Sequence, residues 1–584
     1  MNKIVRIGNV RALILGHCSN DEFGRNRNRM KKYVLALVAF CLPLLMWAQK
    51  AGNKNSEISR NLEVFNDIYK QLDLFYVDTL SADTVIEWGI RAMLRQVDPF
   101  TDYYPANDEE LRTMATGKYA GIGSIIRFHK KEGRTVISEP YEGTPSQLAG
   151  VKAGDVIMSV DGKDVKGMEV SKVSDMLRGE AGTTFELKVK RPGEKKERSF
   201  KITRETIQLP QVPYYGLVHP KVGYIMLTGF TEGASREVRQ ALLELKKQGA
   251  TGLILDLREN PGGALSEAVN IANLFVPKGK KVVYTKGKMA STNRDYYTAS
   301  EPVDTLMSLA VLVDGGSASS SEIVAGCLQD MDRAVVIGTR TYGKGMVQMI
   351  REVPYHGSLK ITTSRYYIPS GRCIQAYDYR HLNADGSVGV VPDSLTKVFY
   401  TAGGREVRDG GGIQPDVKIQ PDSLPSLIYD LVASDVLFDY ATAYVAEHKK
   451  IAPAGELELT EKEYGQFVDF VKASGFTYNR RSDEVLKLLK DVAKREGYFE
   501  TAKNEFDALA AKFSNDLGAD LMRFRKEIEP YVCGEIIHRY YYQKGAVKQQ
   551  LRDDPCVEKA LLLLSDQKAY GSILSAVEPK EDKQ

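Results

Sequence analysis

The sequence predicts a multidomain protein of mixed α/β and α+β class: a β-rich module, then an α/β core, with helical regions at both ends. Three observations lead to this prediction. Apolar runs within 252–263, at 309–313 and at 334–338 indicate buried strands that alternate with amphipathic helices. Residues 119–205 alternate in short apolar and polar runs, which is typical of β-strands. Both ends of the chain have helical periodicity.

Composition agrees with a multidomain globular protein and excludes several classes. The 584 residues are 27% charged and 43% hydrophobic, which suits three or four domains. A net charge of +4, with acids and bases interspersed and no basic stripe, argues against a nucleic-acid partner. The seven histidines are scattered without metal-ligand spacing, so we expect neither a metal nor another cofactor.

The first fifty residues concern export rather than fold. Two lysines precede an apolar run at 33–47 that ends at Ala48, a pattern that predicts a signal peptide over 30–48. Residues 1–29 fit such a signal poorly, and we interpret them as an annotation extension. We therefore expect export to the periplasm or cell envelope of a bacterium.

An N-terminal helical region is predicted over 57–116. Apolar side chains recur there at helical spacing, at Leu62, Phe65, Ile68, Tyr69 and Leu72. The region includes the stretch QVDPFTDYYP, which leads into the β-rich module.

The β-rich module, predicted over 117–206, resembles a PDZ domain. The resemblance rests on the segment GIGSII at 121–126, the phrase PSQLAGVKAGDVIMSVDGKDV at 145–165 and a helix over 171–178. In that fold a glycine-rich loop presents backbone N–H groups to a peptide's terminal carboxylate, and the peptide adds as a strand to a sheet edge. The matching loop is Gly121, Ile122 and Gly123. The alternative is a small β-rich domain without a ligand.

The α/β core, predicted over 207–425, contains Ser319 at a strand-to-helix corner and Lys344 between two glycines, 25 residues later. Such a corner exposes a hydroxyl beside helix-terminal N–H groups, so this pair suggests a serine nucleophile and its lysine base. Each residue also has a non-catalytic alternative. Ser319 could form a capping box, since Glu322 stands three residues after it, and Lys344 could be a solvated surface lysine.

A second strand-turn-helix unit places Gly262 and Gly263 at the same edge of the predicted parallel sheet. The N–H of either glycine could join that of Ser320 as an oxyanion hole. An ordinary tight turn is the alternative for these glycines.

Together with RYYIPSGRCIQ from residue 365 and GGGIQPD from residue 410, these motifs resemble the C-terminal processing peptidase (tail-specific protease) family of serine proteases. The resemblance covers about residues 57–425. It implies that Ser319 is the nucleophile, that Lys344 is the general base, and that Gln348 holds the lysine amine.

The chain departs from the family pattern at Ser320, where alanine is usual, and at Tyr342, where phenylalanine is usual. Neither change removes a reacting group, although the run of serines leaves Ser321 as an unlikely rival nucleophile. Asp330 matches an acidic position of the family, and we interpret its role as structural.

The sequence thus predicts a secreted endopeptidase whose PDZ domain recognises the free C-terminus of protein substrates. A lysine with the ordinary pKa of ~10.4 is protonated, so this lysine must be partly desolvated to serve as a base. A silent peptide-binding scaffold of the same fold is the alternative. A metal-dependent or trypsin-like protease fits less well, because neither a metal-ligand set nor a plausible His-Asp-Ser order is present.

The C-terminal region, predicted over 426–584, is mostly helical and has a break at 453–455. We expect it to contribute packing or oligomer contacts, in a homodimer or higher homo-oligomer, with an adaptor left open. A Cys533–Cys556 disulfide is one candidate, since the four cysteines that follow the predicted signal peptide allow three full pairings. The tail after Glu578 is expected to be disordered.

Overall fold

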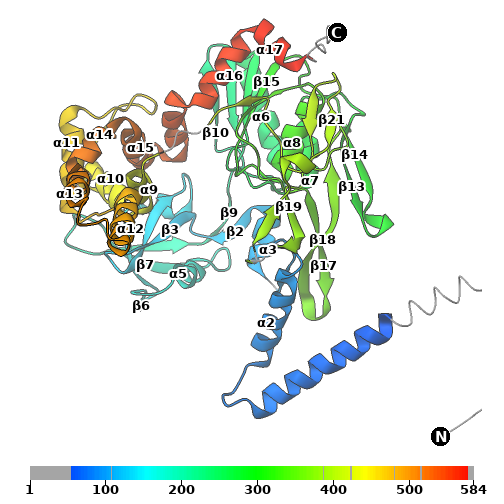
Figure 1. Cartoon of the computed structure of the whole chain (residues 1–584), viewed down its shortest axis with the longest axis horizontal. Helices are drawn as coiled ribbons and strands as arrows, with labels where there is room; N and C mark the ends of the chain where they lie inside the picture. The colour runs from blue at the N-terminus through cyan, green and yellow to red at the C-terminus, as the bar shows by residue number, and fades with distance from the viewer. Residues whose placement is uncertain are drawn as a thin grey trace, which may run out of the picture. The chain divides into compact units, whose positions relative to one another are not determined.

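A computed structural model describes residues 54–575, apart from 107, 384, 386, 421–423, 479 and 513–515. The chain forms two compact units that divide between Met93 and Leu94 (Figure 1). The predicted extension, signal peptide and C-terminal tail lie outside the described residues. Among the helices that are described, none is long and apolar enough to cross a membrane.

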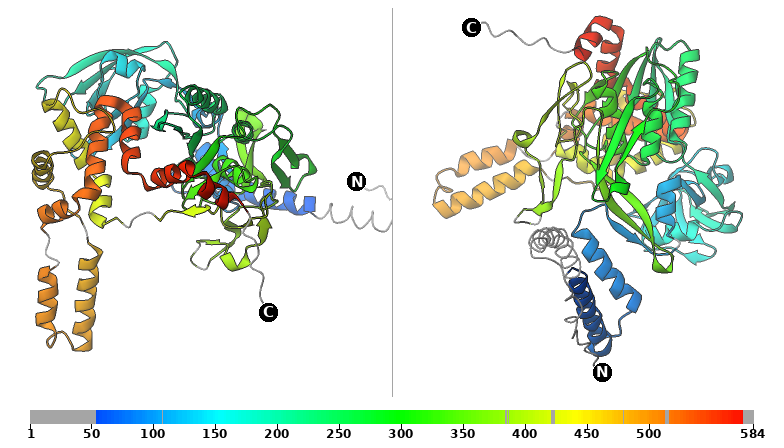
Figure 2. Two further views of the ribbon diagram at one scale, coloured as in Figure 1. Left: turned by 90° about the horizontal axis from the view of Figure 1, so that it is seen from above. Right: turned by 90° about the vertical axis from the view of Figure 1, so that its right-hand side faces the viewer.

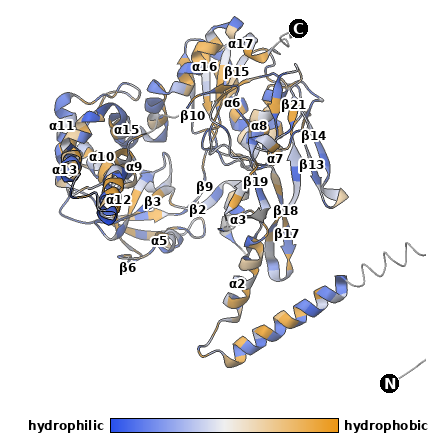
Figure 3. Cartoon of the chain, viewed as in Figure 1, coloured by the Kyte–Doolittle hydropathy of each residue, from blue (hydrophilic) through white to orange (hydrophobic). Residues whose placement is uncertain are grey.

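The described part of the first unit, from residue 54 onward, is helical, which confirms the prediction for the N-terminal region. It contains a helix at 54–75 and most of α2 (Ala82–Arg95), and the ring of Phe65 packs against the backbone of Gly89. Hydrophobic and hydrophilic residues alternate along the first helix (Figure 3). Its apolar side chains are largely exposed, among them Leu62, Phe65 and Ile68.

The second unit begins with two short elements, β1 (Asp102–Tyr104) and α3 (Glu109–Thr116), and continues into the β-rich module. Its main sheet has the order β3-β4-β5-β7-β8, with β6 paired to β5, and β2 pairs separately with β9. The strands are β2 (Lys118–Gly121), β3 (Ser124–His129), β4 (Arg134–Pro140), β5 (Val156–Val160), β6 (Lys163–Asp164), β7 (Thr184–Lys190), β8 (Arg198–Thr203) and β9 (Glu205–Gln208).

Strand β3 lies at the edge of this sheet, and helix α5 (Val170–Leu177) packs beside it. Val173 and Leu177 of α5 are buried in the core of the module. The shorter α4 (Pro145–Ala149) begins at a proline, whose fixed φ suits the first turn of a helix. An open strand edge beside a helix is the arrangement in which a PDZ domain receives a peptide.

The core of the second unit is a six-stranded sheet of order β10-β11-β12-β15-β16-β23, parallel from β11 onward. This confirms the predicted α/β core. Its strands are β10 (Tyr214–His219), β11 (Val222–Met226), β12 (Gly252–Asp256), β15 (Ser308–Val313), β16 (Val335–Gly338) and β23 (Val417–Lys418).

Both faces of this sheet are covered, which is why β12 and β15 are buried along their whole lengths. Helices α6 (Ala234–Lys247), α7 (Leu265–Ala272) and α8 (Ser320–Asp330) pack on one face. The other face is covered by α16 (Pro555–Ser565) and α17 (Gln567–Leu574), the last helices of the chain. Helices α16 and α17 therefore complete the core around this sheet. The sequence did not reveal this role.

A second sheet, of order β1-β18-β13-β14 with β17 paired to β18, lies in the same unit. Its strands are β13 (Lys281–Gly287), β14 (Arg294–Tyr297), β17 (Met346–Val353) and β18 (Gly357–Tyr367), in addition to β1. Two ribbons complete the strands: β19 (Tyr377–Leu382) with β20 (Val388–Val390), and β21 (Val398–Tyr400) with β22 (Glu406–Arg408).

The C-terminal region is mostly helical, as predicted, and it has its own hydrophobic core. Its helices are α9 (Ser426–Ala433), α10 (Val436–Glu447), α11 (Glu461–Ala473), α12 (Arg481–Glu496), α13 (Lys503–Lys512), α14 (Leu517–Arg523) and α15 (Arg525–Gln550). Helices α12 and α13 extend from the others as a pair (Figure 2).

The helical region also contacts the β-rich module through Phe438 of α10. This side chain packs against Val136 and Val156, from the sheet of the module. The guanidinium groups of Arg127 and Arg539 lie 4.1 and 4.4 Å from the centre of its ring. Beside it, buried His129 is hydrogen-bonded to Asp439 at 2.9 Å.

All four cysteines in the described part of the chain are free. The disulfide considered between Cys533 and Cys556 is therefore not formed here. The physical reason is their location, because Cys533 is buried in the core of the helical region and Cys556 in the core beneath α16.

Candidate active site

Ser319 stands where the turn after β15 enters α8. Its φ is 55° and its ψ is −112°, a backbone conformation that costs a non-glycine residue about 1–3 kcal/mol. An ordinary helix cap instead has extended backbone angles. Every residue of α8 is buried, whereas Ser319 is only half-buried. The strained corner thus holds one serine at the surface of an otherwise buried segment.

The carboxylate of Glu322 joins this corner to the turn that contains Lys344. It is fully buried and accepts hydrogen bonds from the Ser319 N–H at 2.8 Å and the Lys344 N–H at 2.9 Å. Its other oxygen accepts from the Gly343 N–H at 2.7 Å and the Thr341 hydroxyl at 2.6 Å. Burial raises the pKa of Glu322 to about 7, against the effect of these four hydrogen bonds.

The glycines on both sides of Lys344 are required by close packing. A Cβ on Gly343, whose φ is 86°, would lie 2.3 Å from the Cβ of Ala376. A Cβ on Gly345 would lie 2.8 Å from the backbone nitrogen of Gln375. The Lys344 turn is therefore packed closely against the segment at 375–376, an approach that residues with a Cβ would block.

The Lys344 side chain is largely removed from water. Its amine lies over the ring of Phe100, with Nζ 4.2 Å from the ring centre. Burial, followed by the positive charge of Lys360, lowers the pKa of Lys344 to about 8, while Glu322 and Asp98 oppose the shift. A lysine with such a pKa is partly neutral near neutral pH and can accept a proton.

The two glycines predicted for an oxyanion hole lie against the serine corner but differ in role. Gly262 donates its N–H to the side-chain oxygen of Asn260 at 2.9 Å, so this donor is already engaged. A Cβ on Gly262 would lie 2.9 Å from the Cβ of Ser319 and from the nitrogen of Ser320. The structure thus favours Gly263 and Ser320 over Gly262 as donors, and gives Gly262 the role of a close contact.

Gln348 does not make the contact that the resemblance implied. Its side-chain amide donates to the hydroxyl of Thr362 at 3.1 Å, and no hydrogen bond joins it to the Lys344 amine among the described residues. The reason is strand pairing, because Gln348 of β17 lies directly opposite Thr362 of β18. The Thr362 hydroxyl in turn lies 3.4 Å from that of Thr101.

The rival serine and the acidic position of the family both have structural partners. Ser321 is fully buried and donates its hydroxyl to the carbonyl of Asn260 at 2.8 Å, which removes it as a nucleophile. Asp330 forms a buried ion pair with Arg372 at 2.8 Å.

Sequence reasoning missed three residues of this site. Glu322 appeared only as half of a capping box, although the structure makes it the link between the two turns. Asp98 and Phe100 appeared only within a connecting stretch. The aspartate before proline in QVDPFT, which is a turn signal, could have drawn attention to this stretch, but not to the lysine that it contacts.

The loop predicted to bind a peptide carboxylate, at 121–123, is held in place through its own backbone carbonyl groups. The carbonyl of Ile122 accepts from the Ser146 N–H at 2.9 Å, and that of Gly123 accepts from the Thr144 hydroxyl at 2.9 Å. Gly121 ends β2 just before the edge strand β3. The guanidinium of Arg178 lies 5.3 Å from the ring centre of Tyr119, which adds a positive charge beside this loop.

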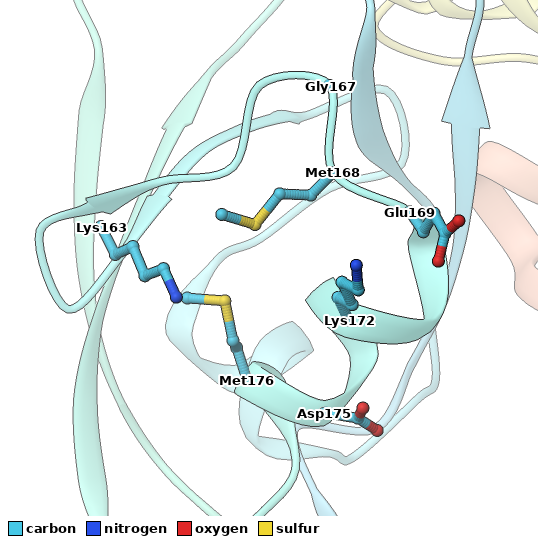
Figure 4. Close-up of a pocket in the computed structure, with 7 residues that line it drawn as sticks. All are labelled: Lys163, Gly167, Met168, Glu169, Lys172, Asp175 and Met176. Atoms are coloured by element: carbon cyan, nitrogen blue, oxygen red, sulfur yellow. The ribbon is translucent and has the colours of Figure 1, made fainter. Parts of the chain in front are cut away.

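The same module also has a surface pocket (Figure 4). Met168 and Met176 border it together with charged side chains from the β6–α5 connection and from α5. Neither the loop at 121–123 nor Ser319 contributes to its lining, so we assign it no function.

Three family models match the chain. They are a PDZ domain over 136–191, peptidase family S41 over 221–395, and the C-terminal helical domain of PDZ-proteases over 427–564. The S41 match contains Ser319, Lys344 and Gln348.

Curated proteins of two bacteria are similar over most of their lengths. The carboxy-terminal-processing protease of Bartonella bacilliformis is 34% identical over 371 residues, which cover 62% of this chain and 82% of that protein. A CtpA-like serine protease of Staphylococcus aureus strain MRSA252 is 30% identical over 457 residues, covering 76% of this chain and 88% of that protein. Among solved structures, the photosystem II D1 C-terminal processing protease is 29% identical, with coverage of 61% and 86% and a TM-score of 0.34.

Proposed function

Because the chain belongs to peptidase family S41, the family of the carboxy-terminal-processing serine proteases, we propose that it is an exported endopeptidase with a Ser319–Lys344 dyad. The observation that supports the dyad best is the lysine itself. Its amine is shielded from water and its pKa is lowered to about 8, in a turn that Glu322 ties to the serine corner.

In the proposed reaction, neutral Lys344 takes the proton of the Ser319 hydroxyl as Oγ attacks a peptide carbonyl. The ammonium then returns the proton to the leaving amine, and an acyl-enzyme remains. In the second half, Lys344 takes a proton from water as the water attacks the ester, and the ammonium returns that proton to Ser319 Oγ as the acid product leaves. The N–H groups of Gly263 and Ser320 stabilise the oxyanion, an effect worth about 3–4 kcal/mol for each donor.

The PDZ domain selects the substrate in this proposal. A free C-terminus adds as a strand to the open edge of β3, and its carboxylate binds the loop formed by Gly121, Ile122 and Gly123. Such binding tethers the substrate and raises its effective concentration at Ser319. Arg178 adds favourable charge for the same carboxylate.

Export, oligomerisation and the domain bounds remain parts of the proposal. The signal-like sequence at 30–48 supports secretion to the cell envelope. The exposed apolar side chains on the helix at 54–75 support a homodimer or higher homo-oligomer. The bounds 57–116, 117–206, 207–425 and 426–584 describe the proposed domains, with α16 and α17 packing onto the core sheet.

The deciding experiment measures cleavage of an unfolded protein substrate by the purified full-length chain and by Ser319→Ala, Lys344→Ala and Lys344→Arg. All three variants should lose cleavage while keeping the wild-type melting temperature within a few degrees. Arginine cannot replace the base because a guanidinium stays protonated. Ser321→Ala is the matched control and should stay active. Equal cleavage by Ser319→Ala and wild type would reject the dyad in favour of another nucleophile, whereas no cleavage by the wild type would favour the silent scaffold.

A further inference from the structure

The turn at 98–101 is built as a rigid unit next to the candidate base. Asp98 is buried and accepts hydrogen bonds from the N–H groups of Phe100 and Thr101, both at 2.8 Å. It also accepts from the Thr101 hydroxyl at 3.1 Å. The next residues form β1, in which Asp102 pairs with Lys360 of β18. The turn is thus fixed both by its own carboxylate and by the sheet.

Within this turn, Phe100 points at Lys344. The lysine Nζ lies 4.2 Å from the centre of the ring. The ring also meets the ring of Tyr379, at 5.7 Å between centres and 88° between planes, in a T-shaped arrangement. Tyr379 stacks in turn on Tyr377. Phe100 is therefore held between an aromatic cluster and the lysine amine.

The same turn also reaches the second residue that the family resemblance placed beside the base. The Thr101 hydroxyl lies 3.4 Å from the Thr362 hydroxyl, which accepts from the side-chain amide of Gln348 at 3.1 Å. One turn therefore contacts Lys344 directly and Gln348 through a single threonine.

We propose that Phe100 is a positioning residue for Lys344, whose ring excludes water from the amine and holds it in place. This inference rests on the proposed function, in which Lys344 is the general base. An aromatic ring over an amine has two opposing effects, since it removes water, which disfavours the ammonium, and presents a π-face, which favours it. We infer that the loss of water is the larger effect here, because burial is the largest cause of the lowered pKa of Lys344.

The charged groups around the amine come from three elements. Lys360 of β18 disfavours the ammonium, whereas Glu322 of α8 and Asp98 of the turn favour it. Burial remains the largest influence, and the pKa of Lys344 is lowered to about 8. Two acidic neighbours and one basic neighbour would not lower the pKa of Lys344 without the apolar cover over its amine.

The test compares Phe100→Ala with Phe100→Leu in the full-length protein. Alanine opens the amine to water, so the pH at which kcat/KM reaches half its plateau should rise by about one unit. At pH 7 this shift lowers kcat/KM by about tenfold, and at pH 10 most of the activity should be recovered. Leucine keeps the apolar cover without the π-face, so its half-plateau pH should stay at or below that of wild type. The matched control is Tyr297→Ala, which removes an exposed ring of β14 that lies near the amine of Lys281 on β13.

A second readout does not depend on catalysis. The rate at which an amine-reactive reagent labels Lys344, followed by mass spectrometry against pH in a Ser319→Ala background, gives the pKa of the amine directly. Phe100→Ala should raise that pKa and Phe100→Leu should not. The proposal is overturned if Phe100→Ala leaves the labelling profile unchanged, or lowers activity by one factor at every pH. If Lys344→Ala were active, the base assignment would fail, while labelling would still report on Phe100.

Discussion

The backbone N–H groups of Ser319 and Lys344 donate to the same oxygen, Oε2 of Glu322, at 2.8 and 2.9 Å. Two residues 25 positions apart in sequence are thereby held by one buried atom. Because the other carboxylate oxygen is bonded to Thr341 and Gly343, neither turn can shift without breaking a charge-assisted hydrogen bond. The geometry of the proposed dyad thus depends on a residue that need not take part in the reaction.

The first prediction concerns this carboxylate. Glu322→Ala leaves four donors in a dry site without an acceptor, and each such loss costs about 1–3 kcal/mol, so folding itself should be impaired. Glu322→Gln keeps one acceptor oxygen but points an amide N–H₂ at two donors. We expect a melting temperature lower by several degrees and cleavage reduced at least about tenfold. Thermal unfolding and peptide cleavage at pH 8 provide the measurements, and wild-type values for both in Glu322→Gln would contradict the role of this residue.

The pH dependence of cleavage is the second prediction. Lys344 must be neutral to act, so kcat/KM should rise about tenfold per pH unit below pH 8 and level off above it. The sign follows from the lowered pKa, since an ordinary lysine would give a rise that continues beyond pH 10. Chelators should have no effect. A profile that is flat from pH 6 to 10 would exclude Lys344 as the base.

Gly262→Ala tests the close approach of the glycine turn to Ser319, the proposed nucleophile. The added methyl group would lie 2.7 Å from the Ala318 oxygen and 2.9 Å from the Ser319 Cβ, so the serine corner must move. A displacement near 1 Å costs about a hundredfold in rate. Gly249→Ala is the matched control, because its φ of +94° is nearly the same as that of Gly262 and nothing lies within 4 Å. The control should lose some stability but little activity; equal activity losses in both variants would assign the effect to backbone strain.

The recognition of C-termini is tested with one peptide in two forms, a free acid and an amide. The intact protein should cleave the acid considerably faster at low substrate concentration, because only the acid can bind the loop at 121–123. Gly123→Ala should reduce the difference, since its methyl group would lie 2.4 Å from the Thr144 Cβ. Gly143→Ala, with a similar φ and open space around it, is the control. Equal cleavage of acid and amide by the wild type would show that the carboxylate is not recognised.

The contact between the PDZ domain and the helical region should depend on pH through His129. Its hydrogen bond to Asp439 raises the pKa of His129, with smaller contributions from the charges of Asp439 and Asp435, while burial and Arg127 oppose the shift. Because the folded pKa lies above the unfolded value, the stabilisation is fully present below about pH 6.5 and is lost as pH rises through the folded pKa.

His129→Gln should therefore reduce the melting temperature more at pH 5.5 than at pH 8.5. The loss at the lower pH should be about 1.5–3 kcal/mol, the range for a hydrogen bond to a charged group. His356→Gln, at an exposed position, should leave the pH dependence unchanged. A uniform loss at both pH values in His129→Gln would mean that the imidazole contributes packing only.

The sequence alone was sufficient for features that depend on local patterns. Buried parallel strands, the module resembling a PDZ domain and the helical ends were each readable from periodicity and turn residues, and the structure confirms them. Ser319 and Lys344 could be paired as candidates because each stands in a short motif whose residue types carry the chemistry. Their roles still rest on the experiments above.

Only the tertiary structure decided how distant segments meet. It placed Phe100 over Lys344, engaged the Gly262 N–H with Asn260, and paired Gln348 with Thr362 across two strands. It also brought α16 and α17 onto the core sheet, although the sequence grouped them with the other C-terminal helices. The physical reason is common to all of these, since hydrogen-bond partners and buried neighbours far along the chain are set by chain packing, which no local periodicity records.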